Sequence, residues 1–290
     1  MTGAEEISCE KFFGGLQKKY TVFSKELSLK TEINFYLPPK AVAGGKCPVI
    51  YYISGMTCDV DIHVQRAGYQ RYASELNLII VSPDTSPRGA GVDGEEGERN
   101  LGTGAGFYLD ATEEKWKKHY RMYSYVVEEL PEIVKAAIPQ ADLDKVGIIG
   151  HSMGGHGALS IYLKNPDKYK SCSVLAPILN PINSPLCQKP FTSYLGSDKS
   201  TWGQYDCSEI LKNISEESFK LLRPILIDMG TMDKYLIGGE LLPEPFLEIA
   251  KKRGLDLNYR MQDGYYHAYG LVSTFMGEHL EHHANLLSSI

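Results

Sequence analysis

The sequence of 290 residues predicts an α/β fold in which helices cover both faces of a mainly parallel sheet. Two observations carry this prediction. Short apolar runs rich in β-branched and aromatic residues alternate with segments of helical spacing. The central runs are also almost continuously apolar, which is typical of strands with both faces covered.

Eight apolar runs are candidate strands. The first two, residues 19–23 and 31–37, are separated by a short turn and are expected to form an antiparallel pair at one edge of the sheet. The others lie at residues 47–54, 78–83, 146–150, 171–176, 224–228 and 257–261. Because no repeat or linker divides the sequence, a single domain spanning residues 1–290 is expected.

Two segments between these runs have a pattern of their own. Apolar residues at spacings of three and four predict a helix over residues 120–137 with one buried face, kinked at Pro131. Residues 87–110 contain seven glycines interleaved with Glu and Arg. This segment is predicted to be a long surface loop, and loops of such length are often functional.

The composition argues against several classes of partner. There are 30 basic and 36 acidic residues, giving a net charge of −6, and the basic residues are scattered, so nucleic acid is not an expected partner. Residues 1–11 lack the apolar run of a secretory signal, and no stretch of about 20 apolar residues predicts a membrane span. Six cysteines without CxxC spacing favour free thiols and a cytoplasmic location.

A Gly-x-Ser-x-Gly motif at residues 150–154 lies between a predicted strand and a helical run. In that context the motif forms a nucleophile elbow, a sharp turn that presents the serine hydroxyl at the edge of the sheet. Glycines flank the serine because side chains there would collide with neighbouring backbone. The alternative is a glycine-rich packing turn, but the context favours an α/β-hydrolase fold with Ser152 as nucleophile.

A serine hydroxyl needs a histidine base and an acid that orients it, here in the chain order serine, acid, histidine. His267 follows the last predicted strand and Asp233 follows the strand before it, so both are expected in loops at the same edge of the sheet as Ser152. Asp228 and Asp263 are alternative acids, and a loop aspartate is often a helix cap or a turn residue.

Five other histidines compete for the role of base or for a metal. His151 and His156 flank the motif and are expected to pack around the elbow. On the last helix, His279 and His283 have the spacing of a metal pair, but no third ligand joins them. These two and His282 are therefore predicted to lie on a solvated helical face, and no metal site is predicted.

Beyond this motif, the sequence resembles the S-formylglutathione hydrolase family, also called esterase D, over essentially its full length. The matching segments occur in the family's order, at residues 13–17 (FGGLQ), 36–39 (YLPP), 54–58 (SGMTC), 83–88 (PDTSPR), 102–108 (GTGAGFY), 110–112 (DAT), 120–124 (YRMYS), 150–159 (GHSMGGHGAL) and 194–196 (YLG). So many ordered matches are specific to that family.

The resemblance implies hydrolysis of S-formylglutathione to glutathione and formate, a step of formaldehyde detoxification, with no metal or organic cofactor. The expected partner is this small-molecule glutathione thioester, and a homodimer is common in the family. By alignment the nucleophile, acid and base are Ser152, Asp233 and His267. The backbone amides of Met56 and Met153 would form the oxyanion hole.

Two residues near the serine are expected at the substrate pocket. By resemblance, Cys58 lies close enough to the site for thiol reagents to block activity, whereas the alternative is an inert buried thiol. His151 is expected at the same pocket, because it precedes Ser152 in the chain.

The sequence also departs from the family pattern in segments expected to line the pocket. Tyr265-Tyr266-His267-Ala268-Tyr269 replaces the usual Tyr-Asp-His-Ser-Tyr, Leu186 replaces a tryptophan, and Arg99-Asn100-Leu101 replaces Trp-Asp-Phe. The substrate is therefore less firmly predicted than the chemistry. A carboxylesterase of broader or different acyl specificity is the main alternative, followed by an acyltransferase and a catalytically inactive binding protein.

Overall fold

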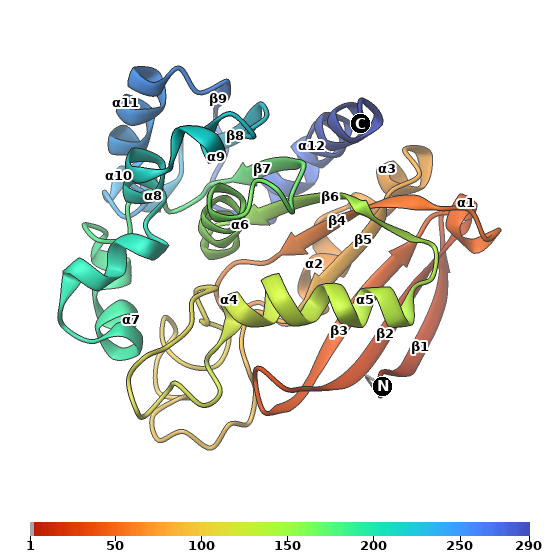
Figure 1. Cartoon of the computed structure of the whole chain (residues 1–290), viewed down its shortest axis with the longest axis horizontal. Coiled ribbons are helices and arrows are strands. Elements are labelled where there is room, and N and C mark those ends of the chain that lie inside the picture. The colour runs from red at the N-terminus through yellow and green to blue at the C-terminus, as the bar shows by residue number, and fades with distance from the viewer. Residues whose placement is uncertain (1–2) are drawn as a thin grey trace.

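The computed structural model describes residues 3–290, which form one nine-stranded sheet flanked by helices (Figure 1). The strands lie in the order β1-β2-β3-β5-β4-β6-β7-β8-β9. Their bounds are β1 Glu5–Phe12, β2 Gly15–Ser24, β3 Leu29–Leu37, β4 Cys47–Ile53, β5 Ile79–Pro83, β6 Ala141–His151, β7 Ser171–Leu175, β8 Ile225–Gly230 and β9 Leu257–Gln262. Strands β4 to β9 pair in parallel, so the predicted α/β-hydrolase architecture with a mainly parallel sheet is confirmed.

The prediction of eight strands was wrong by one, at the N-terminal edge. Strand β1 pairs antiparallel with β2, so the predicted β2–β3 pair is flanked by a further strand. Seven of the eight residues of β1 are exposed, so neither face of this strand is buried along its length. A strand without a buried face has no alternation of apolar and polar residues by which sequence could reveal it.

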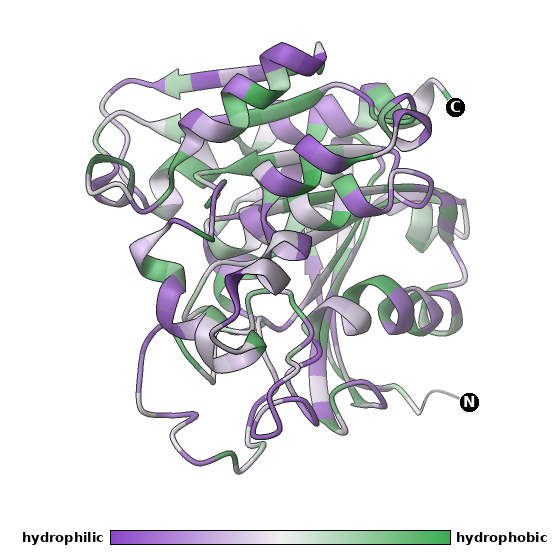
Figure 2. Ribbon diagram, turned by 60° about the vertical axis from the view of Figure 1, so that its left-hand side comes forward, coloured by the Kyte–Doolittle hydropathy of each residue, from purple (hydrophilic) through white to green (hydrophobic). Residues whose placement is uncertain are grey.

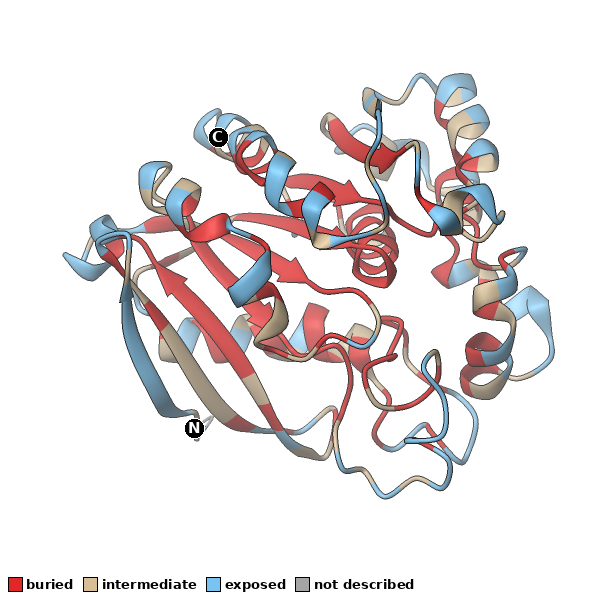
Figure 3. Ribbon diagram, turned by 180° about the vertical axis from the view of Figure 1, so that it is seen from behind, coloured by how far each residue is buried: buried red, intermediate tan, exposed pale blue. Residues whose placement is uncertain are grey.

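Helices cover both faces of the sheet, as Figures 1 and 3 show from opposite sides. Helices α5 and α6 pack over one face, whereas α3 and α12 contact each other over the opposite face. The longer helices are α3 Tyr69–Glu75, α5 Leu130–Ala137, α6 Met153–Lys164, α7 Pro185–Leu195, α8 Cys207–Asn213, α11 Pro243–Arg253 and α12 Tyr269–Ser288. Shorter helices are α1 Pro39–Val42, α2 Ile62–Arg66, α4 Met122–Ser124, α9 Glu216–Phe219 and α10 Lys234–Ile237. No helix within residues 3–290 is long and apolar enough to cross a membrane.

The helix predicted over residues 120–137 is present but distorted before Pro131. It consists of α4, a π-helical segment at Tyr125–Glu129, and α5. Because proline has no N–H group to donate to the preceding turn, a widened turn at this point is its expected effect.

The loop over residues 87–110 is only partly a surface loop. Most residues from 88 to 100 are exposed or partly exposed, but residues 101–109 are almost all buried. Phe107 and Tyr108 have no exposed surface, and the Tyr108 hydroxyl donates to the Ser54 carbonyl at 2.8 Å. The second half therefore packs against the segment that follows β4, which the glycine-rich sequence did not indicate.

The apolar core follows the central strands. Hydrophobic residues concentrate in these strands and in the inner faces of the helices, whereas hydrophilic residues lie on the outer faces (Figure 2). Strands β4 to β8 are buried along most of their length, whereas the β1 edge is exposed (Figure 3). The C-terminal ends of these buried strands carry the residues described next.

Candidate active site

Ser152 occupies a strained turn between β6 and α6. Its backbone has φ 58° and ψ −120°, a conformation that non-glycine residues rarely adopt. A Cβ atom at Gly150 would lie 2.1 Å from the Gly154 carbonyl oxygen, and one at Gly154 would lie 2.1 Å from the Ile53 carbonyl oxygen. Only glycine fits at both positions, so the motif has the geometry of the predicted nucleophile elbow.

The structure brings Ser152, His267 and Asp233 together in one chain of hydrogen bonds. The Ser152 Oγ lies 2.8 Å from His267 Nε2, and His267 Nδ1 lies 2.6 Å from Asp233 Oδ2. Ser152 follows β6, Asp233 follows β8, and His267 follows β9, so loops at the same edge of the sheet position all three. Asp233 has no exposed surface, and Ser152 is 5% exposed.

Asp233 also serves as the helix cap that its loop position suggested. Its Oδ1 accepts hydrogen bonds from the backbone amides of Tyr235 and Leu236 at the start of α10, at 2.8 and 3.3 Å. The other oxygen remains for His267. One carboxylate thus caps α10 and also contacts the His267 ring, and the cap restricts the orientation of that carboxylate.

The two alternative acids lie elsewhere. Asp228 accepts hydrogen bonds from the Arg260 guanidinium at 2.6 Å and lies 3.1 Å from His279 Nε2. Asp263 lies 3.2 Å from the Thr231 hydroxyl. Neither carboxylate is bonded to His267.

Two aromatic neighbours hold the His267 ring. The ring centroids of His151 and Tyr235 lie 5.0 and 4.7 Å from that of His267. Burial, together with the neighbouring His267, lowers the pKa of His151 well below its usual range, so His151 is neutral and acts as a packing surface. Tyr235 stands two positions after Asp233, but no sequence motif marks it as a neighbour of His267.

The two residues predicted to donate amides to the oxyanion lie next to the serine, Met153 in the chain and Met56 in the wall of the pocket that also contains Ser152. Met153 is the first residue of α6, so its amide is one of the unsatisfied N–H groups of that helix. Met56 follows Gly55, where a Cβ atom would lie 3.1 Å from Ser152 Cβ. Among residues 3–290 neither amide has an acceptor, which leaves both available to a developing negative charge.

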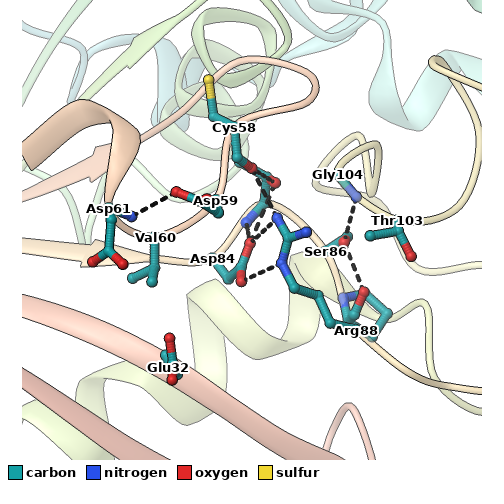
Figure 4. A network of polar contacts seen from close by, with 12 residues as sticks. Glu32, Cys58, Asp59, Val60, Asp61, Asp84, Ser86, Arg88, Thr103 and Gly104 are labelled. Atoms are coloured by element: carbon teal, nitrogen blue, oxygen red, sulfur yellow. Dashed lines mark hydrogen bonds and ion pairs between the residues drawn. The ribbon is translucent and has the colours of Figure 1, made fainter. Parts of the chain in front are cut away.

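An ion pair between the buried Asp84 and the partly exposed Arg88 fixes the loop that carries Met56 (Figure 4). The Arg88 guanidinium binds both carboxylate oxygens of Asp84, at 2.7 and 2.9 Å, and donates to the Cys58 carbonyl at 3.0 Å. The Thr85 hydroxyl donates to the same carbonyl. Burial raises the pKa of Asp84, and the contacts with Arg88 oppose that rise. The loop is therefore anchored two residues beyond Met56.

A second anchor holds this loop at Thr57. The Thr57 amide donates to the Gly104 carbonyl at 2.9 Å, and the Gly104 amide donates to the Ser86 hydroxyl at 2.7 Å. Thr57 has a φ of 66°, so the chain turns sharply at this residue. The buried half of the 87–110 loop thus helps to shape the site.

A pocket of about 180 Å³ opens beside Ser152 and His267. Cys58 and His151 line it, together with Tyr235 and Tyr269. The Cys58 Sγ lies 3.4 Å from the Tyr269 hydroxyl. Cys58 is 7% exposed, and burial raises the pKa of its thiol, which disfavours the reactive thiolate.

The prediction that the histidines of α12 lie on a solvated face was wrong. His279 and His283 have no exposed surface, because their side of α12 packs on the sheet. His283 is within 2.6 and 2.9 Å of the Ser171 and Ser173 hydroxyls. His156 packs beside the elbow as expected, with Nδ1 3.8 Å from Cys207 Sγ.

Known proteins resemble this chain in sequence and in fold. The Esterase family model matches residues 24–283. The S-formylglutathione hydrolase of Bos taurus is 46% identical over 98% of this chain and 99% of that protein. The chain belongs to the S-formylglutathione hydrolase family of esterases. Its relative from Arabidopsis thaliana, of the same name, is also 46% identical, with 99% of each chain covered.

A solved structure of the family has the same fold over its full length. The S-formylglutathione hydrolase from Agrobacterium tumefaciens superimposes with a TM-score of 0.91 at 43% identity, covering 98% of this chain and 99% of that chain.

Some of the departures from the usual family sequence line the pocket, namely Arg99, Leu186 and Ala268. Tyr266 instead points to solvent and is 61% exposed.

Proposed function

We propose that this protein is a serine hydrolase that cleaves S-formylglutathione to glutathione and formate. In this proposal Ser152 is the nucleophile, His267 the general base and Asp233 the acid that orients the base. The observation that carries it is the unbroken chain of hydrogen bonds from the Ser152 hydroxyl through both ring nitrogens of His267 to a buried carboxylate. The identity of 46% to full-length S-formylglutathione hydrolases supports the choice of substrate.

The first half of the reaction forms a formyl-enzyme. His267 Nε2 removes the proton from Ser152 as Oγ attacks the thioester carbon, and Asp233 stabilises the imidazolium that results. The carbonyl oxygen becomes an oxyanion that the amides of Met56 and Met153 stabilise. The C–S bond then breaks, and the glutathione sulfur leaves with the proton that His267 carries.

In the second half, water takes the place of the thiol. His267 removes a proton from that water, which attacks the formyl ester, and the same two amides stabilise the second oxyanion. Ser152 Oγ recovers its proton as formate leaves. The pocket of about 180 Å³ suits a small acyl group, because larger acyl chains would meet Leu186 and Leu241 in its wall.

The reaction belongs to formaldehyde detoxification, in which S-formylglutathione is the intermediate. A cytoplasmic location and a homodimer stay predictions from the sequence. The alternative function is a carboxylesterase with a different acyl preference. The specific observation that favours it is the presence of Arg99, Leu186 and Ala268, rather than the usual family residues, in the pocket.

Steady-state kinetics test this proposal. The expected result is a higher kcat/KM for S-formylglutathione than for p-nitrophenyl acetate, and a loss of roughly 10⁴-fold or more in kcat for both in Ser152→Ala. A higher kcat/KM for the ester would favour the carboxylesterase. Near-normal turnover by Ser152→Ala would refute the assignment of the nucleophile.

A further inference from the structure

Two arginines line the pocket beside Ser152, and each comes from a different part of the chain. Arg66 is the last residue of α2, and Arg99 lies in the exposed half of the 87–110 loop. None of the described residues that line the pocket is Asp or Glu. The pocket is therefore positively charged in a protein whose net charge is −6.

These two guanidinium groups also lack the partners that the other arginines have. Within residues 3–290, neither Arg66 nor Arg99 forms an ion pair or a side-chain hydrogen bond. The remaining six all do: Arg71, Arg88, Arg121, Arg253 and Arg260 each pair with a carboxylate, and Arg223 donates to the Leu286 carbonyl. An arginine left unpaired beside a reactive serine is available to an anionic ligand.

The acidic residues nearest these arginines in the chain are engaged elsewhere. Asp61 binds the Lys19 ammonium at 2.7 Å and accepts from the Asn34 amide. Asp59 accepts hydrogen bonds from the backbone amides of Asp61 and Ile62. Neither of these carboxylates therefore forms an ion pair with Arg66.

Neighbours of Arg99 fix its place at the pocket. Glu98 pairs with Lys189, and the Asn100 side chain donates to the Leu186 carbonyl at 3.1 Å. Both partners belong to α7, so the chain on each side of Arg99 is tied to that helix. Arg99 lies between these two residues that contact α7, and it lines the pocket.

The depth of the pocket separates the reacting atoms from these charges. Ser152 and Cys58 are buried, whereas Arg66 and Arg99 are exposed, so the arginines stand at the opening. A volume of about 180 Å³ is below the roughly 300 Å³ or more that encloses a drug-sized ligand. A glutathione thioester must therefore extend from the buried serine to the opening.

We propose that Arg66 and Arg99 form a carboxylate-binding subsite that receives the glutathione part of the substrate. The inference rests on the proposed function and specifies its recognition step. Glutathione carries two carboxylates, one at its glycyl end and one on its γ-glutamyl end. The planar guanidinium group matches a carboxylate with two parallel hydrogen bonds, and two separate arginines match two separate carboxylates.

The test measures binding without depending on thioester turnover. S-Methylglutathione, which has a thioether in place of the thioester, serves as a competitive inhibitor of p-nitrophenyl acetate hydrolysis. Its dimethyl ester, which keeps the amino group but lacks both carboxylates, serves as the comparison probe. The measured quantity is the ratio of the inhibition constant of the dimethyl ester to that of the acid.

In the wild type this ratio is expected to exceed about 100, since each charged hydrogen-bonded pair contributes about tenfold. Arg66→Gln and Arg99→Gln should each lower the ratio about tenfold, and the double variant should bring it close to one. Arg71→Gln is the matched control, because Arg71 is exposed on α3 and pairs with Glu75 away from the pocket. That variant should keep the wild-type ratio.

A double variant that keeps the wild-type ratio would overturn the inference. If both probes bind more weakly in it by the same factor, the arginines have a structural role. The proposed function fails separately, if the wild type does not hydrolyse S-formylglutathione. In that case, a ratio of inhibition constants that falls in the arginine variants would still establish the carboxylate subsite.

Discussion

Removing the Arg88 guanidinium should slow the reaction although Arg88 does not line the pocket. Arg88 acts through the Cys58 carbonyl and so fixes the loop that carries the Met56 amide (Figure 4). In Arg88→Gln the two bonds to Asp84 and the bond to Cys58 are lost together. Arg88 is thus a positioning residue in this account, and its effect should appear in kcat rather than in KM.

The structure sets the size of the effect. Breaking a buried ion pair costs about 3–5 kcal/mol, but the Arg88 side chain is 38% exposed, so a loss of about 2 kcal/mol in the free energy of unfolding is expected. Complete loss of one oxyanion donor lowers kcat about 10²–10³-fold. Because Thr85 and Gly104 still hold the loop, we expect a fall of about tenfold in kcat.

The assay is p-nitrophenyl acetate hydrolysis at a temperature where urea unfolding shows the variant to be fully folded. Arg121→Gln is the matched control, because Arg121 is also 38% exposed and pairs with Glu26 outside the pocket. It should lose stability but keep kcat. Arg88→Lys, which retains the charge, should recover part of kcat. If Arg88→Gln loses stability while kcat and KM both stay at wild-type values, the ion pair does not position the oxyanion loop.

Three further predictions concern single side chains. Asp233→Asn keeps the helix cap but loses the carboxylate that faces His267, so kcat should fall about 10⁴-fold. The accompanying change in thermal stability should be too small to explain this loss. A fall in kcat of less than tenfold would contradict the assigned role. N-Ethylmaleimide should inhibit slowly at pH 7 and faster at pH 9, because burial raises the pKa of the Cys58 thiol, and Cys58→Ser should abolish inhibition; equal rates at both pH values would contradict this. Burial lowers the pKa of His156 to about 4, below its value of about 6.5 in the unfolded chain. The unfolded state therefore binds a proton more readily, and the free energy of unfolding should fall by about 3 kcal/mol as the pH is lowered from 6.5 to 4. Urea unfolding of His156→Phe should show a correspondingly weaker pH dependence, and an unchanged one would argue against a neutral buried imidazole.

Features encoded in a short stretch of chain were predictable from sequence. The elbow is one, because residues 150–154 contain both the nucleophile and the glycines that its turn requires. Asp233 and His267 could be found because parallel strands place the loops that follow them at one edge of the sheet. The fold was also predictable, because the alternation of strands and helices can be recognised from short stretches of the chain.

Features that depend on packing between distant segments were not predictable. The exposed strand β1 carries no burial pattern, and the spacing of His279 and His283 did not reveal that this side of α12 is buried. Arg66 is 86 residues from Ser152 in the chain, and no local motif connects them. The pairing of basic and acidic side chains, which singles out Arg66 and Arg99, exists only in the folded chain.

The central claim is that the hydroxyl of Ser152 is the group that attacks the substrate. A fluorophosphonate forms a covalent adduct with an activated serine, and peptide mass spectrometry identifies the residue that carries it. We predict a single adduct on the peptide that contains Ser152, with labelling slowed by S-formylglutathione. An unlabelled protein, or an adduct on another residue, would contradict the account.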